Sequence, residues 1–324
     1  MRRNLGLLII SENARGLIHA ISLLLCLAII GACDYKPETF FGQRIPGLEP
    51  IPFAHDILTN QYRPHGRMTF SPDNTELYWE AFTNDKYKRA IFSSRLDDGV
   101  LSIPEFAPFA DTFYYGGPSY SWDGQKIYFW SNKPHGDTIM EEYSGIWCVE
   151  RQNNSWSQPE LIFSDLDSPI SYKSVCATKK GDLFLVAKGP DDSSPIIYIS
   201  EYDEGAYKEP VPLKGDIESF SEQSDVYVDP DEKFVMFSSI VTKEKLGLTD
   251  IFISFKLDDK TWGKPVNLGP IINSEHIQRF PSFSRDGKYF FFVRMIGIPY
   301  NKADVRYYWV KAEALKDIFE KAGH

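Results

Sequence analysis

The sequence predicts an all-β fold, a five-bladed β-propeller, from three observations. A strand–turn–strand unit recurs five times within the 324 residues, a third strand follows each copy, and a proline-marked segment comes after most of these third strands. One repeat is long enough for a four-stranded sheet but too short to be stable alone, so neighbouring repeats must cover each other's apolar faces. We therefore expect five sheets arranged as blades around a central channel.

The strand–turn–strand unit is clearest in residues 69–79, where Ser71, Pro72 and Asp73 separate two apolar runs. Proline sets φ at the second position of a turn, aspartate can bond its own backbone, and glycine supplies positive φ. The five turns are marked by Ser71, Ser121, Thr178, Asp229 and Ser284, at separations of 50, 57, 51 and 55 residues. We expect blades near residues 69–109, 119–163, 175–213, 226–268 and 281–310.

Aspartates recur in these turns and invite comparison with a calcium site. They are Asp73, Asp123, Asp231 and Asp286. Calcium needs six to eight oxygen ligands, and one carboxylate from each of several separated turns does not supply them. We interpret these residues as turn formers.

The outermost strand of each blade is predicted from an aromatic residue followed, two residues later, by proline. This pattern occurs at residues 156–159, 207–210 and 262–265, and residues 101–106 carry a weaker form. Proline is tolerated in edge strands, where its missing N–H faces outward. The fifth repeat lacks the pattern and continues into a short helical segment at 312–321. We expect residues 48–54 to supply its missing edge and close the ring. A sixth blade within residues 34–66 is the alternative.

The N-terminus has the pattern of a targeting segment. Arg2, Arg3 and Arg15 precede an apolar run at 17–32, which Cys33 follows. The run has the length of a secretory signal core and is short for a membrane span. Its end resembles a bacterial lipobox, which implies cleavage before Cys33 and acylation of that residue; an uncleaved membrane anchor is the alternative. We thus expect a signal peptide at 1–32, a tether at 33–47 and one propeller domain at 48–321.

Charge and cysteine content limit the possible partners. The chain has 35 basic and 45 acidic residues, a net charge of −10, and no basic cluster beyond its first three residues. Nucleic-acid binding is therefore not expected, because phosphate recognition needs a concentrated basic face. Cys148 and Cys176 fall in successive predicted blades. We interpret them as buried free thiols, with a disulfide between the blades as the alternative.

The repeats resemble the WD40-like β-propeller repeat of the TolB type, on residues such as 70–73 and 284–287. From about Phe40 to Ile318 the layout is similar to a group of bacterial lipoproteins made only of this propeller, with matching segments at 41–47, 53–54 and 308–310. The departures are Asn74 in place of glycine, Trp122 in place of proline, and a degraded turn at 178–181. The resemblance implies a periplasmic or surface-exposed protein of a bacterial cell envelope. It implies no established activity.

The sequence contains no catalytic or metal-binding motif, and no two of its six histidines share a metal-ligand spacing. We therefore predict no catalytic residue, no cofactor and no metal. The segments that precede the innermost strands should converge at one mouth of the channel, where scaffolds of this kind build ligand sites. The candidate binding residues are Arg63, His65, Tyr115, Lys173, Glu222, Asp225, His276 and Arg279. The alternative is that these groups pair with one another and hold the blades in register.

The leading functional prediction is a lipid-anchored binding or scaffold protein, a monomeric ring that holds an envelope protein or a small carbohydrate-like or peptide ligand at its channel mouth. Its contact with the membrane would be the acylated Cys33. One alternative is an enzyme, for example carbohydrate-active, that pairs Glu222 with Asp225 or Glu275 for acid–base work. Another is a purely structural component of the envelope. The sequence does not choose between these classes.

Overall fold

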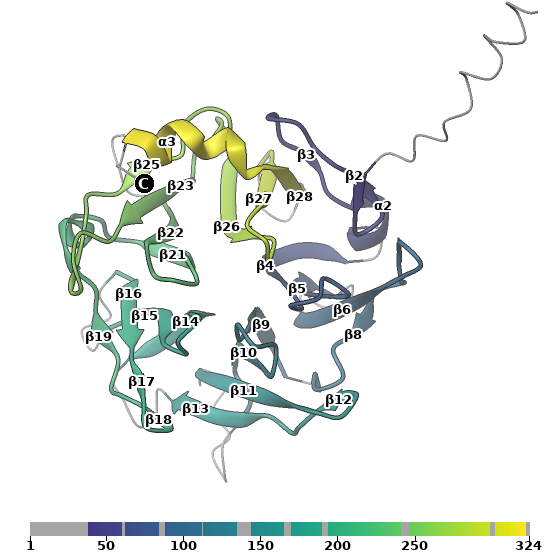
Figure 1. Ribbon diagram of the computed structural model, residues 1–324, viewed down its shortest axis with the longest axis horizontal. Helices are drawn as coiled ribbons and strands as arrows, with labels where there is room; N and C mark the ends of the chain where they lie inside the picture. Colours follow the sequence, from purple (N-terminus) through teal and green to yellow (C-terminus); the bar gives the residue numbers. More distant parts are fainter. Residues whose placement is uncertain are drawn as a thin grey trace, which may run out of the picture. The chain divides into compact units, whose positions relative to one another are not determined.

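Five antiparallel sheets, three of four strands and two of five, are arranged as a ring (Figure 1). The computed structural model describes residues 38–59, 62–83, 88–111, 113–134, 144–164, 170–189, 194–240, 246–298 and 302–321, and residues 39–324 belong to one compact unit. The prediction of a five-bladed β-propeller is confirmed. The predicted signal peptide, Cys33 and the next four residues of the predicted tether lie outside the described residues. Within them, no helix has the length and the apolar character needed to cross a membrane.

The blades are numbered I to V in chain order. In each blade, four main strands follow one another from the channel outward. The innermost strands are β4 (Arg63–Phe70), β9 (Tyr115–Tyr120), β14 (Ser171–Ala177), β21 (Gln223–Val228) and β26 (Ile277–Phe283). The second strands are β5 (Glu76–Phe82), β10 (Lys126–Ser131), β15 (Leu183–Lys188), β22 (Phe234–Ser239) and β27 (Tyr289–Ile296). The third strands are β6 (Arg89–Asp97), β11 (Gly145–Gln152), β16 (Ile196–Ser200), β23 (Asp250–Phe255) and β28 (Asp304–Lys311).

The outermost strands are short. They are β8 (Glu105–Phe106), β13 (Glu160–Ser164), β19 (Val211–Pro212), β25 (Val266–Asn267) and, in blade V, β3 (Ile51–Pro52). The predicted aromatic residues belong to separate strands: Trp156 to β12 (Ser155–Trp156), Tyr207 to β18 (Ala206–Tyr207) and Trp262 to β24 (Thr261–Trp262). The prediction that aromatic residue and proline share the outermost strand is thus wrong in detail. Each proline instead lies just before that strand, because it has no N–H to donate to the ladder.

The N-terminal segment closes the ring as predicted. Ile51 and Pro52 of β3 pair with Trp309 and Tyr308 of β28. Phe53 follows β3 and is completely buried, with its ring centroid 5.1 Å from those of both Phe291 and Trp309. Burying a side chain of this size stabilises the fold by about 2 kcal/mol. The pairing satisfies the outer edge of blade V.

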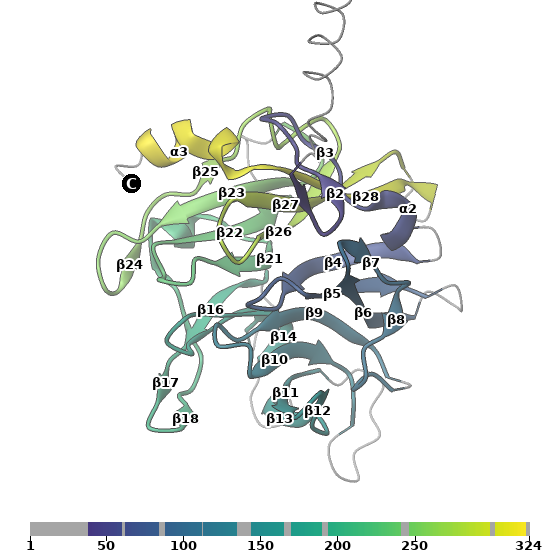
Figure 2. The same cartoon turned by 45° about the vertical axis from the view of Figure 1, so that its right-hand side comes forward.

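Other short elements lie around the periphery of the ring, as a view turned by 45° shows (Figure 2). They include the hairpin β1 (Thr39–Phe40) and β2 (Gln43–Arg44), the helix α2 (His55–Leu58), the strand β7 (Val100–Leu101), the strand β17 (Tyr202–Asp203), the strand β20 (Lys214–Gly215) and the 3₁₀ helix η1 (Asp216–Ser219). The chain ends in η3 (Ala312–Leu315) and α3 (Lys316–Lys321), the predicted short helix. Residues 38–59 and 62–66 therefore hold a hairpin, the closing strand and one helical turn, and no sixth blade is built from them.

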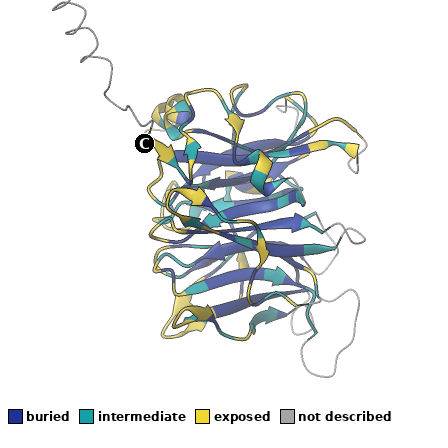
Figure 3. Cartoon of the chain, turned by 90° about the vertical axis from the view of Figure 1, so that its right-hand side faces the viewer, coloured by how far each residue is buried: buried dark blue, intermediate teal, exposed yellow. Residues whose placement is uncertain are grey.

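The core lies between the faces of neighbouring blades, as the layers of buried strand in Figure 3 show. Trp79, Trp309 and Phe291 are completely buried where blades V and I meet. Cys148 and Cys176 are buried free thiols in different clusters, and burial raises the pKa of Cys148 to about 12. The structure thus agrees with free thiols and not with a disulfide.

The repeated turns are held by their own side chains. The hydroxyl of Ser71 donates to Asp73 over 2.6 Å and accepts the amide of Glu76, and Ser121 and Ser284 repeat both contacts in blades II and V. These contacts confirm that Asp73, with its counterparts in those two turns, is a turn former. Asn74 takes positive φ of 55°, a conformation that asparagine tolerates, so its substitution for glycine leaves the turn intact. These turns lie at the channel end opposite to the predicted site.

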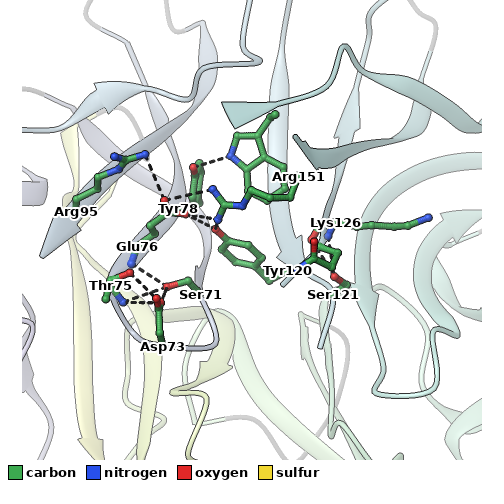
Figure 4. Close-up of polar contacts among 12 residues, drawn as sticks. Ser71, Asp73, Thr75, Glu76, Tyr78, Arg95, Tyr120, Ser121, Lys126 and Arg151 are labelled. Carbon is green, nitrogen blue, oxygen red and sulfur yellow. Dashed lines mark hydrogen bonds and ion pairs between the residues drawn. The ribbon is translucent and has the colours of Figure 1, made fainter. Parts of the chain in front are cut away.

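A network beside the first of these turns links blades I and II (Figure 4). Glu76 Oε2 lies 2.7 Å from the guanidinium of Arg151 and accepts the hydroxyl of Tyr120 over 2.7 Å, and Arg95 lies 3.4 Å from its other oxygen. Burial by itself raises the pKa of Glu76, but Arg151, Tyr120 and Arg95 outweigh it, so the pKa lies below its ordinary value. The Arg151 guanidinium also stacks 4.2 Å from the ring of Trp156. The carboxylate therefore clamps two blades together.

Candidate functional site at the first channel mouth

The innermost strands begin three to six residues before the expected blade starts. Segments predicted to be loops are therefore the first halves of strands, and each of these strands departs from regular pairing. Gly66, Gly117, Asp225 and Phe280 lie at these irregularities and take positive φ. A bulge re-aims the side chains of the strand that carries it. It is this backbone feature that turns polar groups toward the channel.

The channel opens at this end into a cavity of about 350 Å³, which we call the first mouth. All five innermost strands contribute to it. The cavity is lined by four of the eight predicted residues, His65, Lys173, Asp225 and Arg279, and also by Arg67, Glu80, Arg89, Gln223 and Trp130. It has the size of a small-molecule site.

An ion pair crosses the first mouth between blades IV and V. The guanidinium of Arg279 donates to both carboxylate oxygens of Asp225, over 2.7 and 2.8 Å, and lies 4.5 Å from the ring of Phe280. The Asp225 side chain is 6% exposed and that of Arg279 is 27% exposed. Two parallel charge-assisted bonds fix the orientation of both groups. In this part of the site, the two charged side chains neutralise each other.

A buried carboxylate from blade I forms a second cluster. Glu80 Oε1 lies 3.4 Å from His65 and 3.2 Å from Arg89, while its Oε2 accepts the amide of Gly117 over 2.8 Å. Burial by itself raises the pKa of Glu80, but the attraction of His65 and Arg89 and the bond from Gly117 lower it below its ordinary value. Glu80 is thus held as a carboxylate at the wall of the cavity.

Two glycines make room for Glu80. A Cβ atom on Gly66 would lie 2.4 Å from Glu80 Oε2, and one on Gly116 would lie 2.7 Å from it. The hydroxyl of Tyr307, from blade V, bonds the carbonyl of Gly66 over 3.1 Å and fixes the bulge there. Sequence reasoning missed Glu80, which is a single acidic residue within an apolar strand. The available signal was the pair of glycine-containing segments that face that strand.

The other four predicted residues do not line the first mouth. Tyr115 is completely buried and packs on Phe129, and Arg63 lies half-buried at the start of β4. Glu222 accepts the hydroxyl of Ser194 over 2.6 Å, and His276 Nε2 lies 3.9 Å from Glu275. The enzyme alternative needed Glu222 or Glu275 beside Asp225 in the mouth, and the structure places only Asp225 there. Within the described residues, no group of three His, Cys, Asp or Glu side chains is arranged to hold a metal ion.

Arg67 forms the floor of the first mouth. Its guanidinium donates to the carbonyl oxygens of Val226 over 2.6 Å, of Pro118 over 3.4 Å and of Val175. These carbonyls belong to blades IV, II and III, so one side chain from blade I crosses the channel. The residue is 5% exposed. It separates the first mouth from a second cavity on the far side.

Comparison with known proteins assigns no activity to this chain. No family model and no curated protein matches the sequence. Solved structures with similar folds include the catalytic domain of an α-L-arabinofuranosidase from Coprinopsis cinerea, at 12% identity over 82% of this chain and 94% of that one, with a TM-score of 0.49. A protein of unknown function from Dyadobacter fermentans shares 16% identity over 83% of each chain, with a TM-score of 0.46. An oligogalacturonate lyase from Vibrio parahaemolyticus shares 12% identity over 78% of this chain and 67% of that one, with a TM-score of 0.41.

The chain spans only a part of some matched proteins. It covers 32% of the length of a prolyl endopeptidase and 35% of a puromycin-hydrolysing peptidase from Mycobacterium tuberculosis. Likenesses of this degree concern the arrangement of strands. Any function must therefore be argued from the residues of this chain.

Proposed function

We propose that the protein is a non-catalytic binding protein that takes an acidic ligand at its first mouth. The observation that carries this proposal is the charge of the cavity wall. Arg67, Arg89, Lys173 and Arg279 face two carboxylates, those of Glu80 and Asp225, which leaves two positive charges in excess. The whole chain carries a net charge of −10. A cationic recess in an acidic protein attracts anions in preference to the rest of its surface.

The position of Lys173 favours recognition over mere pairing. Asp225 and Arg279 bond each other, Glu80 bonds Arg89, and Arg67 bonds three backbone carbonyls. Lys173 is exposed at the edge of the same cavity. An exposed ammonium group at the edge of a cationic recess is suited to contact a carboxylate that arrives from solvent. The ligand would thus be an acidic peptide segment or a comparable carboxylate-bearing molecule.

A direct test uses a fluorescein-labelled tetra-glutamate peptide, followed by fluorescence anisotropy. We expect it to bind at low salt, to bind more weakly as salt is added, and to lose about tenfold in affinity in Lys173→Met. Lys214→Met is the matched control, since Lys214 is exposed, pairs with Glu218 and lies outside this cavity. Equal binding of a tetra-glutamine peptide, or full binding by Lys173→Met, would contradict the proposal.

We further propose that the propeller is a lipoprotein of a bacterial envelope, anchored through Cys33 and facing the periplasm or the outside. The support is the lipobox-like end of the apolar run and the resemblance of the repeats to the TolB-type propeller. Labelling of cells with an alkyne fatty acid is expected to mark the wild-type protein and to leave Cys33→Ser unmarked. Equal labelling of both proteins would exclude Cys33 as the anchor.

A further inference from the structure

The far end of the channel opens into a second cavity, of about 550 Å³. It lies beyond Arg67, and the ends of the five innermost strands, the repeated turns and helix α3 surround it. None of the predicted site residues lines it. Its wall is more aromatic than that of the first mouth, with Trp122, Tyr227, Phe234, Phe283 and Phe319.

Five equivalent positions, each two residues before a turn marker, form a circle in this cavity. They are Thr69, Ser119, Cys176, Tyr227 and Ser282. In blades I to III the side chain at this position accepts a backbone amide from the next blade: Tyr120 to Thr69 and Ala177 to Ser119, each over 3.1 Å, and Val228 to Cys176 over 3.4 Å. Blades IV and V lack this bond among the described residues.

Ser282, the equivalent residue of blade V, does not accept such a bond from any described residue. The residue is 3% exposed, and its hydroxyl has no hydrogen-bond partner within the described part of the chain. A buried hydroxyl without a partner is less favourable than one that is bonded. Because Ser282 lines the cavity, a ligand bound there could supply the missing partner.

Two guanidinium groups in the cavity lack carboxylate partners among the described residues. Arg67 bonds three carbonyls, as described above, and Arg285 donates to the carbonyl oxygens of Trp122 and Ser121. Arg285 also lies 4.3 Å from the ring of Trp122, so it reaches from blade V across to blade II. Burial lowers the pKa of Arg285 below its ordinary value, and the charge of nearby Asp123 offsets this only in part. An incoming carboxylate would compensate that charge.

Four acidic residues line the cavity: Asp229, Asp231, Asp286 and Glu313. Glu313 of η3 forms no ion pair with Arg67 or Arg285 among the described residues, and the other three are engaged elsewhere. Asp286 lies 3.0 Å from Lys288, and Asp231 lies 3.3 Å from Lys179. Asp229 accepts the backbone amides of its own turn, from Asp231 and Lys233. Besides Arg67 and Arg285, the cavity is lined by Lys316, by the hydroxyls of Thr69, Ser119, Ser282 and Ser284, and by the aromatic rings.

The aromatic wall favours a flat apolar ring over a sugar. The ring centroids of Tyr227 and Phe283 are 5.3 Å apart, and those of Phe234 and Phe319 are 5.1 Å apart. Such rings pack well on a further aromatic group. A sugar would bring several hydroxyls, whereas Thr69 and Ser119 already accept backbone amides and have mainly their own hydroxyl protons left to donate.

We propose that this second cavity binds a small aromatic carboxylate, with its ring among Trp122, Tyr227 and Phe283 and its carboxylate on Arg285 and the Ser282 hydroxyl. This site differs in place and in ligand class from the first mouth. It does not depend on the function proposed there.

The test is calorimetric titration with phenylacetate, with phenylacetamide as a neutral analogue and glucuronate as a sugar acid. Phenylacetate is expected to bind with a negative heat-capacity change and to raise the melting temperature. Phenylacetamide and glucuronate should bind at least tenfold more weakly. In Arg285→Met the affinity for phenylacetate should fall at least tenfold. Arg306→Met is the matched control, because Arg306 pairs with Asp304 and lines neither cavity.

Ser282→Ala provides a second variant that does not disturb folding. It removes a hydroxyl that has no partner, so the melting temperature should stay constant or rise, while the affinity for phenylacetate falls a few-fold. No binding of phenylacetate at 10 mM (about 100-fold above a Kd of roughly 0.1 mM, which corresponds to about −5.5 kcal/mol) would overturn the proposal. Equal binding of phenylacetamide, stronger binding of glucuronate, or full affinity in both variants would also overturn it.

Discussion

Strand β5 carries two buried glutamates that contact blade II in different ways. Glu76 is bonded by Arg151 and Tyr120, and Arg95 lies near it, so each of its charged partners is an arginine. Glu80 is held by His65, Arg89 and the amide of Gly117, and it lies at a cavity wall. Arginine keeps its charge at any ordinary pH, whereas histidine can lose it near neutrality.

The difference shows how the same residue type serves two purposes in one repeat. The partners of Glu76 are permanent and close the gap between two blades, which is a structural role. The partners of Glu80 include a titratable group and a partly exposed arginine beside open space, which is an arrangement that a ligand can alter. Burial alone does not separate the two glutamates; the nature of their partners does.

Replacing these glutamates one at a time is expected to give the largest changes in the free energy of unfolding. Glu76→Gln leaves Arg151 without its counter-charge and is expected to lower the free energy of unfolding by about 3 kcal/mol. Glu80→Gln should cost less, about 2 kcal/mol, because the Arg89 side chain is 30% exposed and can reach water. Urea denaturation followed by circular dichroism measures both.

Glu150→Gln serves as the control for this pair. Glu150 lies 2.9 Å from Lys126 but is 54% exposed, so its loss should change the free energy of unfolding by less than about 1 kcal/mol. If Glu80→Gln proved more destabilising than Glu76→Gln, the assignment of structural and ligand-facing roles would have to be reversed.

The dependence of stability on acid pH should show a smaller contribution from the same two glutamates. The pKa of each glutamate is lowered in the folded protein from an ordinary value of 4.5, so each carboxylate binds its proton more weakly than in the unfolded chain. Their stabilising contribution is therefore complete above about pH 4.5 and is lost as the pH falls through the lower, folded values. A double Glu76→Gln, Glu80→Gln variant should lose less stability on acidification than wild type. If the stability of both proteins fell equally with decreasing pH, other groups would be responsible for the acid destabilisation.

The fold could be predicted because its determinants are local and repeated. Ser71 and Asp73 hold their turn through bonds within five residues, and copies of the same pattern mark the other turns. The closing strand was predictable from a vacancy in the last repeat and an unassigned strand before the first. Both inferences needed only the spacing and character of residues along the chain.

The site could be predicted only in part, because bulges decide which side chains face the channel. Lys173 and Arg279 reach the first mouth, whereas Tyr115 turns into the core and Glu222 bonds Ser194. Glu80 comes from a second strand and enters the wall only because two glycines leave space for it. Arg67 crosses to three other blades. These are non-local contacts, and no pattern within one repeat encodes them.

The pairing of β3 with β28 has a consequence for biosynthesis. Ile51 emerges from the ribosome well before Trp309, its partner across the sheet. Contacts between such distant positions form slowly and leave intermediates prone to aggregation. Strand β3 must therefore stay unpaired while blades I to IV assemble. A nascent chain that stalls before residue 304 lacks β28, the strand with which β3 pairs.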